Sequence, residues 1–198
     1  MNITIEEYDS SGASAHLIDA AITASYQAAF SGFPWNSQVT AEEAKIQFEK
    51  HKRKNGFKCL YAMTIIPTAS NNIFSVSEHE LLGALWWDCP TENQLLEERG
   101  EKLVKFARQK ANTLLIWERE IFVRPEYHGN GIGKMLRKSF LEKLPIIYGS
   151  FLVLTRMRDD NIPVIKIAEE FGYERTGIKI SSSKPGIDHE YWFYKAKE

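Results

Sequence analysis

The spacing of apolar side chains along the chain predicts helices and strands in succession. Apolar residues recur every four positions from Ile18 to Phe30, which is typical of a helix, and Gly32 ends it. Thr40 and Glu43 form the pattern of a capping box, which predicts a second helix running toward Arg53. Alternating or continuous apolar runs predict seven strands, at residues 2–8, 57–66, 80–88, 116–123, 151–154, 177–180 and from 187 onward.

Between residues 116 and 140 a strand pattern passes through a glycine-rich turn into an amphipathic helix. Pro125 stops the strand because proline cannot donate to a ladder, and Gly129, Gly131 and Gly133 follow at every second position. Glycine adopts positive φ and lets a ligand approach the backbone closely. Free N–H groups at the start of a helix bind phosphate well. The segment therefore predicts an anion site.

The spacing of the glycines excludes two common nucleotide motifs. A dinucleotide fingerprint would need glycine where Lys134 or Leu136 stands. A Walker A loop would need glycine in place of His128 and serine or threonine in place of Met135. A different class of phosphate-containing ligand is therefore indicated.

Two segments together resemble the GNAT superfamily of acetyl-CoA-dependent N-acetyltransferases. Val123-Arg124-Pro125 followed by HGNGIG at residues 128–133 resembles the first signature, Q/R-x-x-G-x-G/A after a V-x-P turn, with His128 in place of Gln or Arg. The segment NIPVIKIAEEFGYERTG at residues 161–177 resembles the second signature, in which Asn161 and Gly172 match. The two matches stand in the family's order.

The resemblance implies a mixed α/β fold for residues 1–198 as a single N-acetyltransferase domain. Its central twisted sheet is mostly antiparallel, is flanked by helices, and is splayed between the fourth and fifth strands. Residues 90–111, of helical composition, are extra to this plan and form an expected inserted helix or helix pair. This insertion could be a lid, a dimer face or a solvated cover.

The resemblance also implies acetyl-CoA as co-substrate, without a metal. Backbone N–H groups around Phe122 and Val123 are expected to stabilise the oxyanion. The expected contacts to the rest of the cofactor come from the glycine turn and the second signature, at His128, Gly129, Asn130, Gly131, Ile132, Gly133, Lys134 and Asn161.

The implied reaction is direct attack of an amine on a thioester, which requires a base. Glu118 and Glu120 are the candidates, since residues two apart in a strand share a face. The alternative is that both sit at an exposed rim or pair with Arg119 or Arg124.

The sequence leaves several candidates for the general acid. Ala168 stands where many relatives have tyrosine. Thiolate protonation is then left to water, to Tyr173, Tyr191 or Tyr194, or to no residue.

The aromatic loop at residues 30–36 either lines the acceptor pocket or packs onto the core. The resemblance favours the pocket, because the same region borders the acceptor site in the family.

The composition of the chain limits the classes of binding partner that we expect. Lys+Arg number 25 against 26 Asp+Glu, so no basic excess indicates nucleic acid or an anionic membrane. Cys59 and Cys89 have no metal-site spacing, and the first residues lack the pattern of a signal peptide, so the expected location is the cytoplasm. No apolar run approaches the roughly 20 residues that span a bilayer.

The expected function is N-acetyl transfer from acetyl-CoA to a primary amine of a small molecule. A protein or peptide acceptor, a non-catalytic acyl-CoA-binding regulatory module, and an unrelated phosphate-binding fold remain the alternatives. A homodimer is also compatible with the sequence.

Overall fold

The computed structural model describes residues 1–32, 35, 37–66, 78–110, 113–181 and 188–195. The expected polar connection with Asn71-Asn72 lies outside these residues, as do Phe33, Pro34 and Asn36 of the aromatic loop. None of the helices in the described ranges has the length and apolar character needed to cross a membrane.

Seven strands form one sheet in the order β1-β2-β3-β4-β5-β7-β6. All neighbouring pairs are antiparallel except β4 and β5, which are parallel. The mostly antiparallel sheet predicted from the sequence is therefore confirmed. The strands are β1 (Ile3–Glu7), β2 (Lys58–Ile66), β3 (Glu78–Asp88), β4 (Leu114–Val123), β5 (Phe151–Arg158), β6 (Glu174–Ser181) and β7 (Asp188–Lys195).

Two helices, α1 (Ala15–Ser31) and α2 (Ala41–Lys52), cover one face of the sheet. Gly32 follows the last residue of α1, and the capping box of Thr40 and Glu43 opens α2, both as predicted. Their buried apolar residues pack against Trp86 and Phe122 of the sheet. This face is called the α2 face below.

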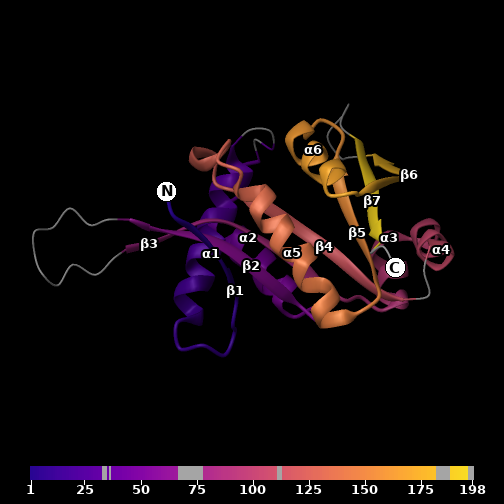
Figure 1. Ribbon diagram of the computed structural model, residues 1–198, viewed down its shortest axis with the longest axis horizontal. Coiled ribbons are helices and arrows are strands. Elements are labelled where there is room, and N and C mark those ends of the chain that lie inside the picture. The colour runs from indigo at the N-terminus through magenta and orange to yellow at the C-terminus, as the bar shows by residue number, and fades with distance from the viewer. Residues whose placement is uncertain (33–34, 36, 67–77, 111–112, 182–187, 196–198) are drawn as a thin grey trace, which may run out of the picture.

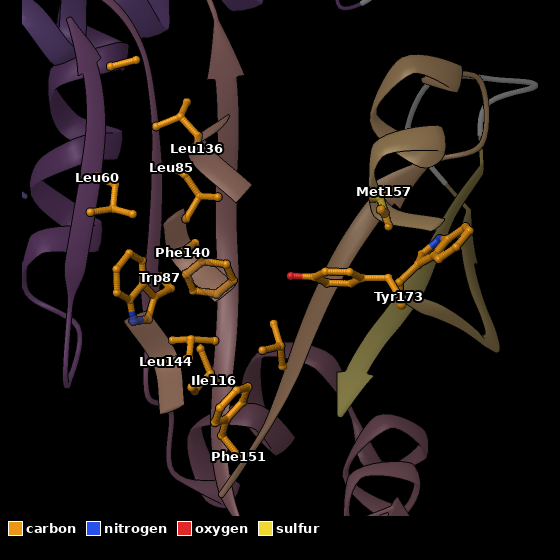
Figure 2. Close-up of a cluster of buried hydrophobic side chains, with 14 of the residues drawn as sticks. Leu60, Leu85, Trp87, Ile116, Leu136, Phe140, Leu144, Phe151, Met157 and Tyr173 are labelled. Atoms are coloured by element: carbon orange, nitrogen blue, oxygen red, sulfur yellow. The ribbon is translucent and has the colours of Figure 1, made fainter. Parts of the chain in front are cut away.

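The opposite face is covered by α5 (Ile132–Tyr148) and α6 (Ile162–Glu170). Leu136, Phe140 and Leu144 recur along α5 and pack with Trp87 and Ile116 of the sheet (Figure 2). This face is called the α5 face. A short 3₁₀ turn at Pro125–Tyr127 joins β4 to the loop that precedes α5.

The expected insertion is a helix pair, α3 (Glu92–Arg99) and α4 (Glu101–Lys110), separated by Gly100. Leu95, Leu103 and Val104 pack against Trp117 of β4 and residues of β5 and β7. The pair therefore extends the α2 face over the second half of the sheet rather than standing free in solvent. Figure 1 shows α3 and α4 on the side of the molecule where β4 begins.

Candidate active site

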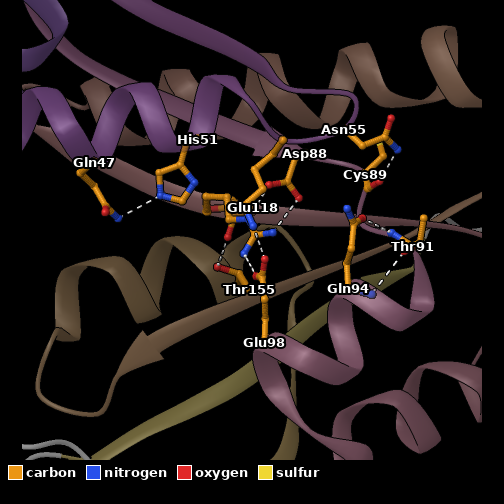
Figure 3. Close-up of polar contacts among 12 residues, drawn as sticks. Gln47, His51, Asn55, Asp88, Cys89, Thr91, Gln94, Glu98, Glu118 and Thr155 are labelled. Carbon is orange, nitrogen blue, oxygen red and sulfur yellow. Dashed lines mark hydrogen bonds and ion pairs between the residues drawn. The ribbon is translucent and has the colours of Figure 1, made fainter.

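The sheet opens between β4 and β5. The two strands pair from Leu114 opposite Phe151 as far as Glu118 opposite Thr155, and no pairing continues beyond that point in the described strands. The Thr155 hydroxyl donates to the Glu118 carbonyl over 3.1 Å, closing the narrow end (Figure 3). Beyond it, β4 continues along β3 while β5 diverges toward α6 (Figure 1). This gap confirms the splay expected between the fourth and fifth strands.

A cavity of about 450 Å³ occupies the gap. Gln47 and His51 of α2 line it from one face of the sheet, and Arg137 of α5 and Val164 of α6 line it from the other. Two ligands approaching from opposite faces of the sheet could therefore meet in this cavity.

A β-bulge in β4 determines which side chains face the cavity. Trp86 lies opposite Glu120 and Trp87 lies opposite Glu118, so Arg119 is an extra residue between two pairs. Trp86 belongs to the α2 face and Trp87 to the α5 face. The expectation that Glu118 and Glu120 share one face is therefore wrong, because alternation by two holds only in a regular strand.

Glu118 is fully buried in a polar network on the α5 face. Arg137 of α5, also fully buried, forms an ion pair with Oε1 of Glu118. The Tyr173 hydroxyl donates to Oε2 over 2.6 Å and points toward β4 in Figure 2. Both carboxylate oxygens are thus occupied. The alternative of pairing with Arg119 or Arg124 is also wrong for Glu118.

Glu120 differs from Glu118 in its exposure, its partners and the face of the sheet on which it lies. Its side chain lines the cavity and is partly exposed, and no described residue forms a hydrogen bond or close ion pair with its carboxylate. Burial raises the pKa of Glu120 to about 7, against the opposing effect of the nearby cations Arg156 and Arg99. Of the two candidates, Glu120 is the one that combines a place in the cavity with a pKa raised toward neutrality.

The glycine turn leaves its backbone accessible. Gly129 and Gly131 have φ of 82° and 74°, and a Cβ at either position would meet no atom within 4 Å. Asn130 Nδ2 donates to the carbonyls of Tyr127 (3.1 Å) and His128 (3.4 Å), so the Asn130 side chain fastens the loop. The N–H groups of residues 129–134 have no acceptor among the described residues, and no side chain caps α5. They form a set of donors suited to phosphate.

His128 and Val123 meet at the end of β4. His128 Nε2 lies 2.9 Å from the Val123 carbonyl, which can only accept, so Nε2 carries the proton. The Arg124 N–H donates to the Leu82 carbonyl of β3. Since N–H groups of an antiparallel strand point alternately to either side, the N–H of Phe122 also faces β3. The N–H of Val123 faces the gap. Of the two expected oxyanion donors, the geometry offers Val123 and not Phe122.

Lys134 and Asn161 flank the glycine turn on two different helices. Lys134 forms an exposed ion pair with Glu170 of α6. Asn161 is buried at the start of α6, makes no capping hydrogen bond with its side chain, and lines the cavity. The Asn161 amide is therefore available to a ligand in the gap.

Hydroxyl groups near the gap are mostly committed elsewhere. Ala168 is fully buried and brings none. Burial and the neighbouring Glu118 raise the pKa of Tyr173 well above its ordinary value. Burial also raises the pKa of Tyr191, while the centroid of the Tyr194 ring lies 5.5 Å from that of the tilted Tyr173 ring.

Three arginines on the α2 face lie at the site, and two of them, Arg99 and Arg156, were not predicted from the sequence. Arg119 donates to both oxygens of Asp88 (2.6 and 3.0 Å) and to Glu98 of α3 (2.6 Å), and Figure 3 shows Glu98 reaching toward Asp88. Arg99 of α3 and Arg156 of β5 also line the cavity. The insertion therefore forms one wall of the cavity and is not merely a solvated cover.

Trp35 is the described part of the aromatic loop beyond α1, and it fits both earlier readings. It lines the cavity, its ring lies 5.1 Å from that of Phe30, and the Arg158 guanidinium lies 4.5 Å above it. The aromatic loop thus packs onto the core and borders the cavity.

Comparisons with known proteins support the fold. No family model and no curated protein sequence matches the chain. Among solved structures, the ribosomal-protein-S18-alanine N-acetyltransferase from Escherichia coli aligns with a TM-score of 0.60 at 14% identity, covering 98% of this chain and 94% of that one.

Two further solved structures have the same fold as this chain. A Desulfovibrio desulfuricans protein assigned to the GNAT family of acetyltransferases aligns with a TM-score of 0.58 at 12% identity, covering 98% of this chain and 99% of that one. The acetyltransferase yncA from Salmonella typhimurium, solved with acetyl-CoA, aligns with a TM-score of 0.56 at 15% identity, covering 100% and 96%. Over its full length the chain therefore has the fold of the GNAT acetyltransferases, as its two sequence motifs predicted.

Proposed function

We propose that the protein is an N-acetyltransferase that transfers an acetyl group from acetyl-CoA to the primary amine of a small molecule. The observation that carries the proposal is the position of Glu120. An unpaired carboxylate with a pKa near neutrality lies in a cavity that joins the two faces of a splayed sheet.

The residues around the gap fit acetyl-CoA. The unpaired N–H groups from Gly129 to Lys134 suit a pyrophosphate, and the absent side chains of Gly129 and Gly131 leave room for it. The Asn161 amide and the Val123 N–H face the gap, where an amide-containing chain and a carbonyl oxygen would find donors. The neighbour solved with acetyl-CoA has the same fold.

Acetyl-CoA, when bound, supplies an acetyl thioester whose C–S bond breaks as the acceptor nitrogen forms the new N–C bond. Glu120 prepares the acceptor. An alkylammonium has a pKa of about 10, so at neutral pH a proton must leave before the nitrogen can attack. A carboxylate with a pKa near 7 accepts this proton, directly or through water, and passes it to solvent through the partly exposed cavity.

No described side chain is well placed to protonate the departing thiolate. Tyr173 is held by Glu118, and Ala168 has no hydroxyl. Water in the cavity serves instead, and a thiol pKa of about 8.5 makes a free thiolate tolerable.

Thermal unfolding with acetyl-CoA, CoA, ATP and NAD in parallel tests the cofactor. A ligand at about 100 times its dissociation constant adds roughly 2.7 kcal/mol of stability. We expect a shift with acetyl-CoA and CoA only. No shift with either at millimolar concentration would overturn the proposal.

Turnover is tested by release of free thiol from acetyl-CoA in the presence of amines. The screen includes alanine-terminated peptides, since one structural neighbour is named for a ribosomal-protein alanine acceptor. Cofactor binding without thiol release from any amine or peptide would favour a non-catalytic acyl-CoA-binding module, to which Ala168 in place of tyrosine also points.

A further inference from the structure

Most of the charged residues that line the cavity have partners of opposite charge. Arg119 and Lys54 pair with Asp88 and Glu98, and these four charges cancel. Likewise, Arg137 pairs with Glu118 and Arg158 with Asp160. Among the described residues that line the cavity, Lys50, Arg99 and Arg156 remain without a carboxylate partner, against the single unpaired carboxylate Glu120.

Arg99 and Arg156 line the same cavity as Glu120 and come from two different elements. Arg156 lies on β5 opposite Tyr191 of β7, on the face that packs against α3 and α4. Arg99 is the last residue of α3, and its guanidinium lies 4.8 Å from the Trp117 ring. Each arginine acts electrostatically on the other and on Glu120. Two like charges therefore share the cavity with the proposed base.

Arg99 is only partly satisfied in this position. Its Nε is buried and has no hydrogen-bond partner among the described residues, while its guanidinium lies over the Trp117 ring and interacts with the Tyr191 side chain. Burial and, to a smaller extent, repulsion by Arg156 lower the pKa of Arg99. A buried donor without an acceptor costs stability unless a ligand completes it. Guanidinium groups bind carboxylates and phosphates with paired hydrogen bonds.

We infer that the amine acceptor carries an oxyanionic group, a carboxylate or a phosphate, which Arg99 and Arg156 bind while its amine faces Glu120. This inference rests on the proposed function, since it names the substrate class of the same site. It also gives the insertion a role: α3 brings Arg99 to the acceptor, and the Arg119–Glu98 and Lys54–Glu98 pairs hold α3 against the sheet.

The test uses matched acceptors that differ only in the anion. β-Alanine is compared with β-alaninamide, and O-phosphoethanolamine with ethanolamine. A neighbouring negative charge raises the pKa of an ammonium group, so without specific contacts the neutral member of each pair would react faster. We expect kcat/KM to favour the anionic member of at least one pair by about 10- to 100-fold, as for a hydrogen-bonded charge pair. The pair that shows the larger preference distinguishes a carboxylate from a phosphate.

The variants Arg99→Gln and Arg156→Gln should each reduce this preference by about tenfold or more. Arg53→Gln is the control, because Arg53 is an exposed arginine at the end of α2 that does not line the cavity. A wild-type kcat/KM that does not favour the anionic member in either pair, whether the two members react equally or the neutral one reacts faster, would overturn the inference while leaving the acetyltransferase proposal intact.

A binding measurement covers the case in which none of the four amines is acetylated. Calorimetric titration of the same four compounds into the CoA-saturated protein reports affinity without turnover. Tighter binding of an anionic member, lost in Arg156→Gln, supports the acceptor class even if the transferase proposal fails. The absence of any preference in the titration overturns the inference.

Discussion

Glu118 and Glu120 are two residues apart in β4 and lie on opposite faces of the sheet, because Arg119 forms a bulge between them. The bulge separates two tasks. Glu118 anchors a buried network with Arg137 and Tyr173 on the α5 face. Glu120 presents a free carboxylate to the cavity at the place where β5 leaves β4.

Replacing Glu120 by glutamine tests the assignment of the base. The amide has nearly the same shape but cannot accept the proton, so kcat/KM for amine acetylation should fall by about 100- to 10,000-fold. Steady-state thiol release measures this loss, and thermal shift with CoA should show unchanged cofactor binding. Glu97→Gln, an exposed change on α3, is the matched control. Full activity in Glu120→Gln would exclude Glu120 as the base.

The pKa of Glu120 predicts a pH profile. Glu120 accepts a proton only when ionised, so activity should rise as the pH passes through about 7. This inflection should be missing from the residual activity of Glu120→Gln. Measuring kcat/KM from pH 5.5 to 9 with an acceptor of known amine pKa separates the titration of the enzyme from that of the amine. The same inflection in the variant would assign it to another group.

The raised pKa of Glu120 also predicts that its ionised form lowers the stability of the folded protein. Its pKa is raised from an ordinary value of 4.5 to about 7, so the folded state holds this proton more tightly than the unfolded state. The protonated Glu120 side chain makes its full contribution to the free energy of unfolding below pH 4.5, and this contribution is lost as the pH rises through about 7. Glu120→Gln should therefore unfold at a higher temperature than wild type at pH 8 and at nearly the same temperature at pH 5. The reverse pattern would contradict burial as the cause of the shift.

Features encoded within a few neighbouring residues could be predicted from the sequence. The end of α1 at Gly32, the capping box at Thr40 and the glycine turn before Ile132 depend on local backbone chemistry, and all three lie where expected. The splay also followed, but through resemblance to a family rather than from the residues alone.

Features that depend on pairing between distant segments could not be predicted. The bulge at Arg119 is defined by the register of β4 against β3, which no periodicity in β4 reveals. Arg137 meets Glu118 only because α5 packs back across the sheet, and Arg99 reaches the cavity only because α3 packs on Trp117. Charged residues on a predicted helix are usually solvent-exposed, so their burial is a tertiary result.

The Arg137–Glu118 pair predicts a large loss of stability when only one partner is removed. Arg137→Met leaves a buried carboxylate with Tyr173 as its remaining partner and should cost about 3–5 kcal/mol. Urea denaturation measures the loss. The double variant Arg137→Met/Glu118→Leu should recover a substantial part of it, because no charge then stays buried.

Lys138→Met, on the exposed side of the same helix, is the control for this pair. Its ion pair with Glu142 spans 3.8 Å at the surface, so its loss should cost at most about 0.5 kcal/mol. A double variant as unstable as Arg137→Met would show that packing, and not the uncompensated charge, carries the cost.

The glycine turn predicts a selective loss of cofactor affinity. Gly131→Ala places a methyl group where the backbone has φ of 74° and open space in front of it, so we expect about 1–2 kcal/mol of strain. The methyl group would also obstruct the phosphate, weakening acetyl-CoA binding by about 10- to 100-fold. Gly149→Ala is the matched control, since Gly149 follows the other end of α5 with φ of 67° and equally open surroundings. Calorimetric titration should show normal affinity in Gly149→Ala despite its own strain. Equal losses of affinity in both variants would mean that backbone strain, rather than a ligand at the turn, explains the effect of Gly131→Ala.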